Sequence, residues 1–92
     1  MTFEIIRQPR KKAYYLNIFH AAKPTTQLSL VGFPEVVVPV RYYIWYTHRY
    51  WAAELLVNRT TYDMPVAFSN YRTLKALINN ILWEIKNVEL PF

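Results

Sequence analysis

The fold of this chain of 92 residues is decided by one stretch, Arg41–Trp51, which has the sequence RYYIWYTHRYW. Aromatic and β-branched residues at this density favour a β-strand. Successive side chains of a strand point to opposite faces of the sheet, so the stretch and the residue before it divide into two sets. One set is Val40, Tyr42, Ile44, Tyr46, His48 and Tyr50, and the other is Arg41, Tyr43, Trp45, Thr47, Arg49 and Trp51.

The second set combines flat rings with guanidinium groups, which is the chemistry of a binding surface. Aromatic rings on an open sheet stack on bases for about 1–3 kcal/mol each, and arginine both stacks and pairs with phosphate. We therefore expect a platform that consists of Tyr43, Trp45, Arg49 and Trp51, with Arg41 as a further binding residue and Arg10, Lys11 and Lys12 supplying phosphate contacts nearby. The alternative is structural: large rings thicken a thin core, and a helix on each sheet face would cover the platform.

Further strands are predicted on both sides of this stretch. The segments with strand character are Phe3–Gln8, Ala13–His20, Leu28–Val31, Ala52–Val57 and Met64–Phe68. Val36–Val40 is β-branched, but Pro39 cannot donate a ladder hydrogen bond, so this segment is placed at a sheet edge or as the entry to the long strand. Pro65 favours an edge position for the last strand in the same way.

The clearest element is a C-terminal helix over about residues 69–87. Its apolar residues recur at the spacing of a helical stripe, namely Leu74, Leu77, Ile78, Ile81, Leu82 and Ile85. Ser69 or Asn70 is a suitable N-cap. The sequence thus predicts a single α+β domain, residues 1–92, in which an antiparallel sheet of four or five strands carries this helix on one face.

Trp83 lies opposite the apolar stripe, since nine residues at about 100° each turn it roughly 180° from Leu74. Basic residues share this outer side of the helix, namely Arg72, Lys75 and Lys86. Two interpretations stay open. The C-terminal tail or a loop covers the indole, or the indole and the cations form a second recognition surface.

Composition limits the possible functions. Eleven basic and six acidic residues give a net charge of +5, which favours anionic partners such as nucleic acid, a nucleoprotein complex or an acidic protein surface. The chain has no cysteine, which excludes disulfides and thiol chemistry. No apolar run is long enough to cross a membrane, and the first residues do not form a secretory signal, so we expect a cytoplasmic protein.

Catalysis is not expected, because the sequence contains none of the common catalytic motifs. His20 and His48 are the two histidines, which is too few for a usual zinc site, and no metal or cofactor is predicted. They leave open one less favoured alternative, a metal-free nuclease with one imidazole as base and the other as acid.

The function we expect is non-catalytic binding of nucleic acid or of a ribonucleoprotein complex through the aromatic and basic surface. The alternative is a small inhibitor, of the kind made by phages or mobile elements, that binds and blocks a host protein complex such as a defence nucleoprotein. Self-association is a further possibility, because an exposed edge strand such as Val36–Val40, or the exposed rings, could build a homodimer.

Overall fold

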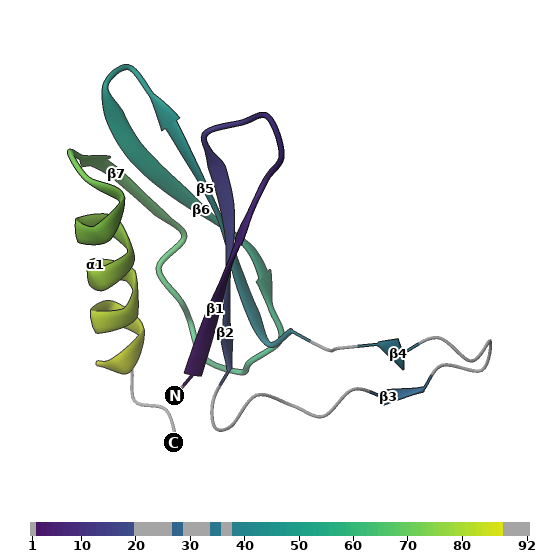
Figure 1. Ribbon diagram of the computed structural model, residues 1–92. Helices are drawn as coiled ribbons and strands as arrows, with labels where there is room; N and C mark the ends of the chain where they lie inside the picture. The colour runs from purple at the N-terminus through teal and green to yellow at the C-terminus, as the bar shows by residue number, and fades with distance from the viewer. Residues whose placement is uncertain (1, 20–26, 29–33, 36–37, 88–92) are drawn as a thin grey trace.

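The computed structural model describes residues 2–19, 27–28, 34–35 and 38–87, and it confirms the α+β fold. Five antiparallel strands form one sheet in the order β1-β2-β5-β6-β7, and one helix packs against it (Figure 1). The elements of this layer pair are β1 (Thr2–Arg7), β2 (Ala13–Phe19), β5 (Val40–Thr47), β6 (Tyr50–Asn58), β7 (Ala67–Tyr71) and α1 (Leu74–Lys86).

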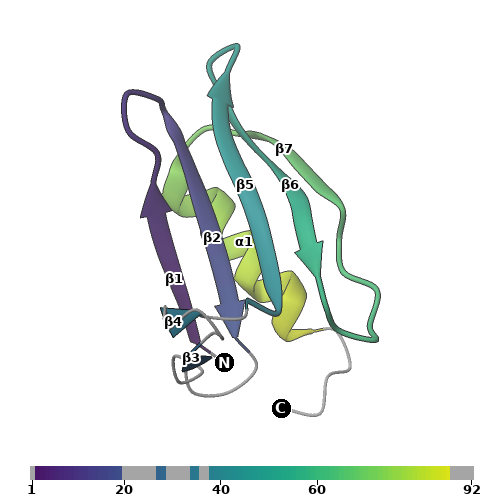
Figure 2. The ribbon, with the colours of Figure 1, turned by 90° about the vertical axis from the view of Figure 1, so that its right-hand side faces the viewer.

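The hydrophobic core lies between α1 and one face of the sheet. The helix contributes four buried side chains at the predicted spacing, namely Leu77, Ile78, Ile81 and Ile85. They pack on Leu16 and Ile18 of β2 and on Val40, Tyr42 and Ile44 of β5. The alternation expected for this stretch is therefore confirmed from Val40 to Trp45. The buried residues Val40, Tyr42 and Ile44 alternate with three half-buried ones, Arg41, Tyr43 and Trp45. Figure 2 shows the helix behind the sheet, on that face alone.

The expected strand Arg41–Trp51 is divided by a two-residue turn. His48 and Arg49 both have left-handed φ angles, 50° and 70°, and they connect β5 to β6. Such a turn pairs Tyr46 with Trp51, and paired residues share a face of the sheet. Trp51 consequently lies on the helix side and packs against the core, so its predicted place on the platform side of the sheet is wrong.

Three other expectations are settled or corrected. Val40 belongs to β5, which is paired on both sides, so the described end of Val36–Val40 is the entry to the central strand and not a sheet edge. The helix begins at Leu74 and not near residue 69, because β7 continues to Tyr71 and Thr73 is the N-cap. The strand predicted over Met64–Phe68 is β7, shifted three residues along the chain, and it is an edge strand as Pro65 indicated.

Two short strands, β3 (Gln27–Leu28) and β4 (Pro34–Glu35), pair with each other outside the main sheet. The strand expected over Leu28–Val31 coincides with β3 at one residue, and the rest of it lies outside the described residues. Among the residues that the structure describes, no helix has the length and apolar character needed to span a membrane.

Candidate binding face

Four residues on the side of the sheet away from α1 form what we call the aromatic face: Tyr15, Arg41, Tyr43 and Trp45. Tyr15 comes from the middle of β2 and is paired with Tyr43, and Arg41 and Trp45 flank Tyr43 on β5. Val40, Tyr42 and Ile44 of β5 point into the core. Because successive side chains of a strand point to opposite faces, the residues between them point away from the core. All four residues of the aromatic face are half-buried, so the three aromatic rings and the guanidinium group are not sealed in the interior.

The rings of this face form a continuous row. Trp45 and Tyr43 are stacked, with centroids 5.7 Å apart and planes inclined by 19°. Tyr43 in turn contacts Tyr15 across the strand pair, at 5.5 Å and 49°. These separations are within the range of favourable ring pairs. The row therefore offers a preformed surface for a further flat group.

Arg41 is held at the end of this row by a chain of hydrogen bonds. Its Nε donates to Oδ1 of Asn17 over 2.7 Å, and Nδ2 of Asn17 donates to Oε1 of Glu4 over 2.9 Å. The guanidinium carbon lies 5.3 Å from the centroid of the Tyr15 ring, which is a cation–π contact. The bond to Asn17 uses Nε alone, and within the described part of the chain the two terminal nitrogens of Arg41 remain available to an anion.

A second group of cations lies at one end of the sheet, at the tips of two hairpins (Figure 1). The β1–β2 turn carries Arg10, Lys11 and Lys12, which are all exposed, and the β5–β6 turn carries exposed Arg49. The first turn is bound to β5 by a hydrogen bond from the backbone N–H of Tyr46 to the carbonyl of Lys12, 3.1 Å long. We call Arg10, Lys11, Lys12 and Arg49 the basic end. It adjoins the aromatic face, because Trp45 is paired with Ala13, the residue that follows Lys12.

Two carboxylates moderate the positive charge. Glu54 is exposed on β6 and is paired with Tyr43, so it borders the aromatic face on one side. Glu4 borders it on the other side through Asn17. An anionic ligand would therefore place its charges toward the basic end or toward Arg41, and its uncharged rings over the centre.

The sequence did not assign Tyr15 to the platform, although a signal was present. In a strand, Tyr15, Asn17 and Phe19 share a face, and the pairing of β2 with β5 brings that face beside Tyr43. What the sequence could not provide was the identity of the neighbouring strand. Trp51, by contrast, joins an aromatic group on the helix side, 6.0 Å from Tyr14 and 5.1 Å from Tyr46.

The basic and aromatic residues predicted around the helix lie on the opposite side of the molecule. Trp83 is 60% exposed, so nothing in the described part of the chain covers most of its indole. Lys75 and Lys86 are exposed on the same helix, and Arg72 is exposed just before it. Since the sheet separates these residues from the aromatic face, the two groups cannot contact one small ligand together (Figure 2).

The remaining chemistry is sparse. His48 is exposed in the β5–β6 turn, whereas His20 lies outside the described residues, so the two-histidine hypothesis stays a prediction. The described residues contain no group of three or more histidine, aspartate or glutamate side chains that could hold a metal ion. Comparisons of the chain with protein-family models, curated proteins and solved structures give no significant match.

Proposed function

We propose that this protein acts in the cytoplasm as a non-catalytic module that binds single-stranded nucleic acid, alone or within a nucleoprotein complex. The observation that carries the proposal is the stacked pair Tyr43 and Trp45, which lies half-exposed on the sheet face that α1 leaves uncovered. Stacking on such rings tolerates any base, because every base has a flat π face. Neither the hydrogen bonds nor the shape of this face implies one particular base sequence.

The charges favour one orientation of the strand. Bases would lie over Trp45 and Tyr43, and phosphates would approach the basic end, since Glu54 repels them along the β6 side. Arg41 would contact a phosphate or stack on a base at the other end of the ring row. Ion pairs with phosphate release counterions, so affinity should fall as salt rises, with a slope set by the number of contacts.

The proposal is tested by titrating the protein into fluorescently labelled single-stranded RNA and DNA oligonucleotides at several salt concentrations. Trp45→Leu keeps an apolar side chain over its neighbours but removes the stacking plane, and we expect affinity to fall about tenfold or more. Exchanging Lys11 and Lys12 for glutamine should weaken binding for all sequences and reduce the salt slope. Trp83→Leu is the matched control, because it removes an indole that is exposed on the opposite side of the molecule.

A second function is favoured by the two carboxylates that border the aromatic face. A surface with Trp, Tyr and Arg in the centre and mixed charges at the rim also fits a protein partner, as in an inhibitor that covers a site of a host complex. Salt-independent RNA affinity, or an effect of Trp83→Leu equal to that of Trp45→Leu, would contradict the nucleic-acid proposal. Retention of a partner after nuclease treatment, lost in Trp45→Leu, would support the inhibitor instead.

A further inference from the structure

β1 is the first strand of the five-stranded sheet and forms one of its two edges. Among the described strands β1 pairs with β2 alone, and its residues are exposed except Glu4, which is half-buried. Its apolar side chains are unusually accessible: Phe3 is 47%, Ile5 43% and Ile6 42% exposed. Open edges with free backbone donors and acceptors pair readily with another strand, and proteins usually block them.

Within the described residues, β1 has none of the bulges, prolines or lysines that often block an edge, and its charged residues are Glu4 and Arg7. The other edge does have such features. Six consecutive residues of β1 are in register with β2 without a bulge, and none of them is proline or lysine. At the opposite edge, β7 pairs through a register shift, Asn70 has a left-handed φ of 67°, and Pro65 precedes the strand. Of the two edges, β1 therefore has the more regular backbone for pairing with another strand.

The backbone of β1 presents alternate residues to this edge. The N–H of Gln8 donates to the carbonyl of Ala13 over 2.9 Å, so Gln8 directs its polar groups toward β2. In an antiparallel ladder this direction alternates along the strand. Ile6 consequently points its backbone groups toward β2, whereas Phe3, Ile5 and Arg7 point theirs outward.

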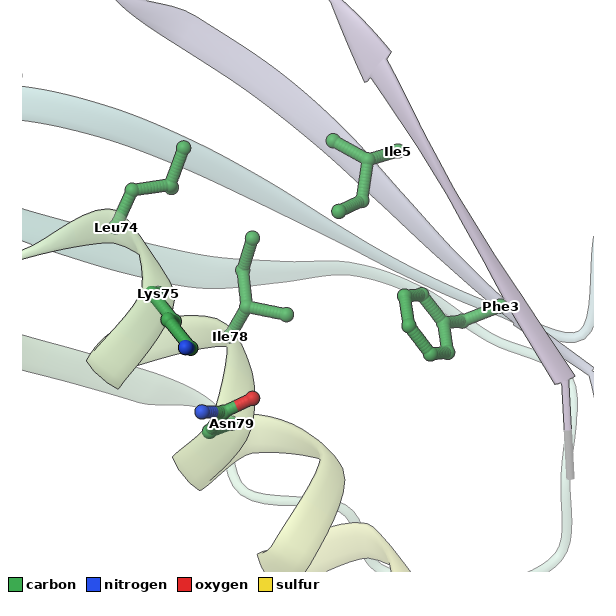
Figure 3. Close-up of a pocket in the computed structure, with 6 residues that line it drawn as sticks. All are labelled: Phe3, Ile5, Leu74, Lys75, Ile78 and Asn79. Atoms are coloured by element: carbon green, nitrogen blue, oxygen red, sulfur yellow. The ribbon is translucent and has the colours of Figure 1, made fainter.

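An apolar groove lies beside the same edge, on the helix side. It has a volume of about 310 Å³ and is lined by Phe3 and Ile5 of β1 and by Leu74, Lys75, Ile78 and Asn79 of α1. Figure 3 shows the Phe3 ring and the Ile5 side chain projecting from β1 toward the helix, with Lys75 and Asn79 on the near side of α1. The groove exists because the backbone of the helix lies nearest to β6 and β7, at the other end of the strand order from β1.

We propose that β1 pairs antiparallel with the β1 of a second copy of this chain, joining the two sheets into one and placing the two grooves side by side. The pairing is centred on Ile5, which lies opposite the Ile5 of the second copy about a two-fold axis. In this register every residue whose backbone groups point outward is paired with another such residue. Ile5 lies opposite Ile5 of the second copy, and Phe3 lies opposite Arg7. The side chain of Arg7 covers the exposed Phe3 ring, as in a cation–π pair.

The neighbouring register is less favourable. If the strands were centred on Glu4, the two Glu4 carboxylates would lie directly opposite each other, which is destabilising. Arg7 would also lose Phe3 as its partner. A shift by a single residue to an odd pairing would bring Ile5 opposite Glu4, whose side chain lies on the other face of the sheet and whose backbone groups point toward β2, so the ladder hydrogen bonds could not form. The register centred on Ile5 therefore has the best match of backbone and side chains.

Cysteine substitutions test both the partner and the register, because the natural chain has no cysteine. Directly opposite residues in a hydrogen-bonded pair have Cα atoms about 5.5 Å apart, which a disulfide can span. Under mild oxidation, Ile5→Cys should give a covalent dimer on a non-reducing gel. Phe3 and Ile6 are as exposed as Ile5, but in this register neither lies opposite its own counterpart in the second copy. Phe3→Cys and Ile6→Cys should therefore stay largely monomeric.

Charge substitutions test the same contact in solution without a covalent bond. Ile5→Lys and Ile5→Glu each place two like charges on the two-fold axis, and we expect the dimer dissociation constant to rise about tenfold or more in each variant. Mixing the two variants in equal amounts should restore dimers, which also shows that both are folded. Sedimentation equilibrium over a wide concentration range measures all three samples and the natural chain.

Several results would overturn the proposal. The natural chain could sediment as a monomer at every concentration, which would leave the edge to an extended segment of another protein. Ile5→Cys could cross-link no better than Phe3→Cys, which would exclude the register. Dimers of Ile5→Lys as stable as those of the natural chain would place the interface elsewhere, for example on the aromatic face.

Discussion

The hydroxyl of Tyr42 donates a hydrogen bond of 2.6 Å to the carbonyl of Pro65. Tyr42 is fully buried in the centre of β5, and Pro65 lies in the segment that leads into β7. The bond therefore links the middle of the sheet to a segment with little regular structure, while the Tyr42 ring packs edge-on against Phe68 at 5.9 Å.

Tyr42→Phe should leave the Pro65 carbonyl without its donor. We expect the free energy of unfolding to fall by about 2 kcal/mol, the usual cost of a buried polar group that loses its partner. Urea denaturation followed by far-ultraviolet circular dichroism measures the change. Tyr43→Phe is the matched control, since that residue lies on the half-exposed aromatic face. An equal loss in both variants would show that the hydrogen bond is not the source of the effect.

Alkaline pH should destabilise the fold through the same residue. Burial raises the pKa of Tyr42 above the ordinary value for tyrosine. Above about pH 10 the unfolded chain loses this proton while the folded chain keeps it, so stability falls by about 1.4 kcal/mol per pH unit for this group. The difference in unfolding free energy between the natural chain and Tyr42→Phe should narrow as pH rises above that value. A constant difference would contradict the burial of a neutral phenol.

The helix N-cap gives a third prediction. Oγ1 of Thr73 accepts a hydrogen bond from the backbone N–H of Ala76, 3.1 Å long. Thr73→Ala should reduce stability by about 1 kcal/mol, and Thr73→Ser should retain most of it. Ser69→Ala is the control, because Ser69 is exposed in β7 and does not cap the helix. If Ser69→Ala proved more costly than Thr73→Ala, the start of the helix would be misplaced.

Glycine at position 49 of the β5–β6 turn should increase the stability of the fold. Arg49 has a φ of 70°. A residue with a Cβ atom adopts this backbone angle at an energetic cost, whereas glycine adopts it freely. Arg49→Gly should therefore raise the unfolding free energy by about 0.5–1 kcal/mol. Thr47→Gly, in the adjoining strand, should lower it by a similar amount. Thermal melts measure the stability of both variants. If Arg49→Gly were less stable than Thr47→Gly, the interpretation that Arg49 strains the turn would be wrong.

Trp83 provides a test of what an exposed indole does for the fold. The residue is 60% exposed. Trp83→Ala should therefore change stability by less than about 1 kcal/mol. Ile81 lies two residues earlier and is fully buried, so Ile81→Ala should cost about 2–5 kcal/mol. Loss of cooperative melting in Trp83→Ala would show that the indole is covered in solution.

The parts of the fold that follow from local periodicity could be predicted from sequence. The stripe from Leu74 to Ile85 identified the helix and its buried side, and the alternation along β5 separated Tyr42 and Ile44 from Tyr43 and Trp45. Both patterns depend only on the geometry of one element. The pairing of β2 with β5, and hence the place of Tyr15 beside Tyr43, depends on contacts between distant segments.

The turn at His48 and Arg49 could not be recognised because it lacks the usual turn residues. Two-residue hairpins favour asparagine, aspartate and glycine, which tolerate left-handed φ angles. Here the pairing of the two flanking strands outweighs the local preference, since Ile44 and its partner Ala53 are fully buried. The error moved Trp51 to the wrong face, because a turn reverses the strand whereas a continuous strand would have kept alternating.

The direction of α1 has a practical consequence for anyone who attaches something to this chain. The start of β1 and the end of α1 lie at the same end of the sheet, away from the two hairpin tips (Figure 1). A fluorescent reporter or an affinity tag placed at the start of β1 or at the end of α1 would therefore lie away from the turns that carry Arg10 and Arg49. The same layout suits a domain that is tethered at its base inside a larger polypeptide while its far tip stays accessible.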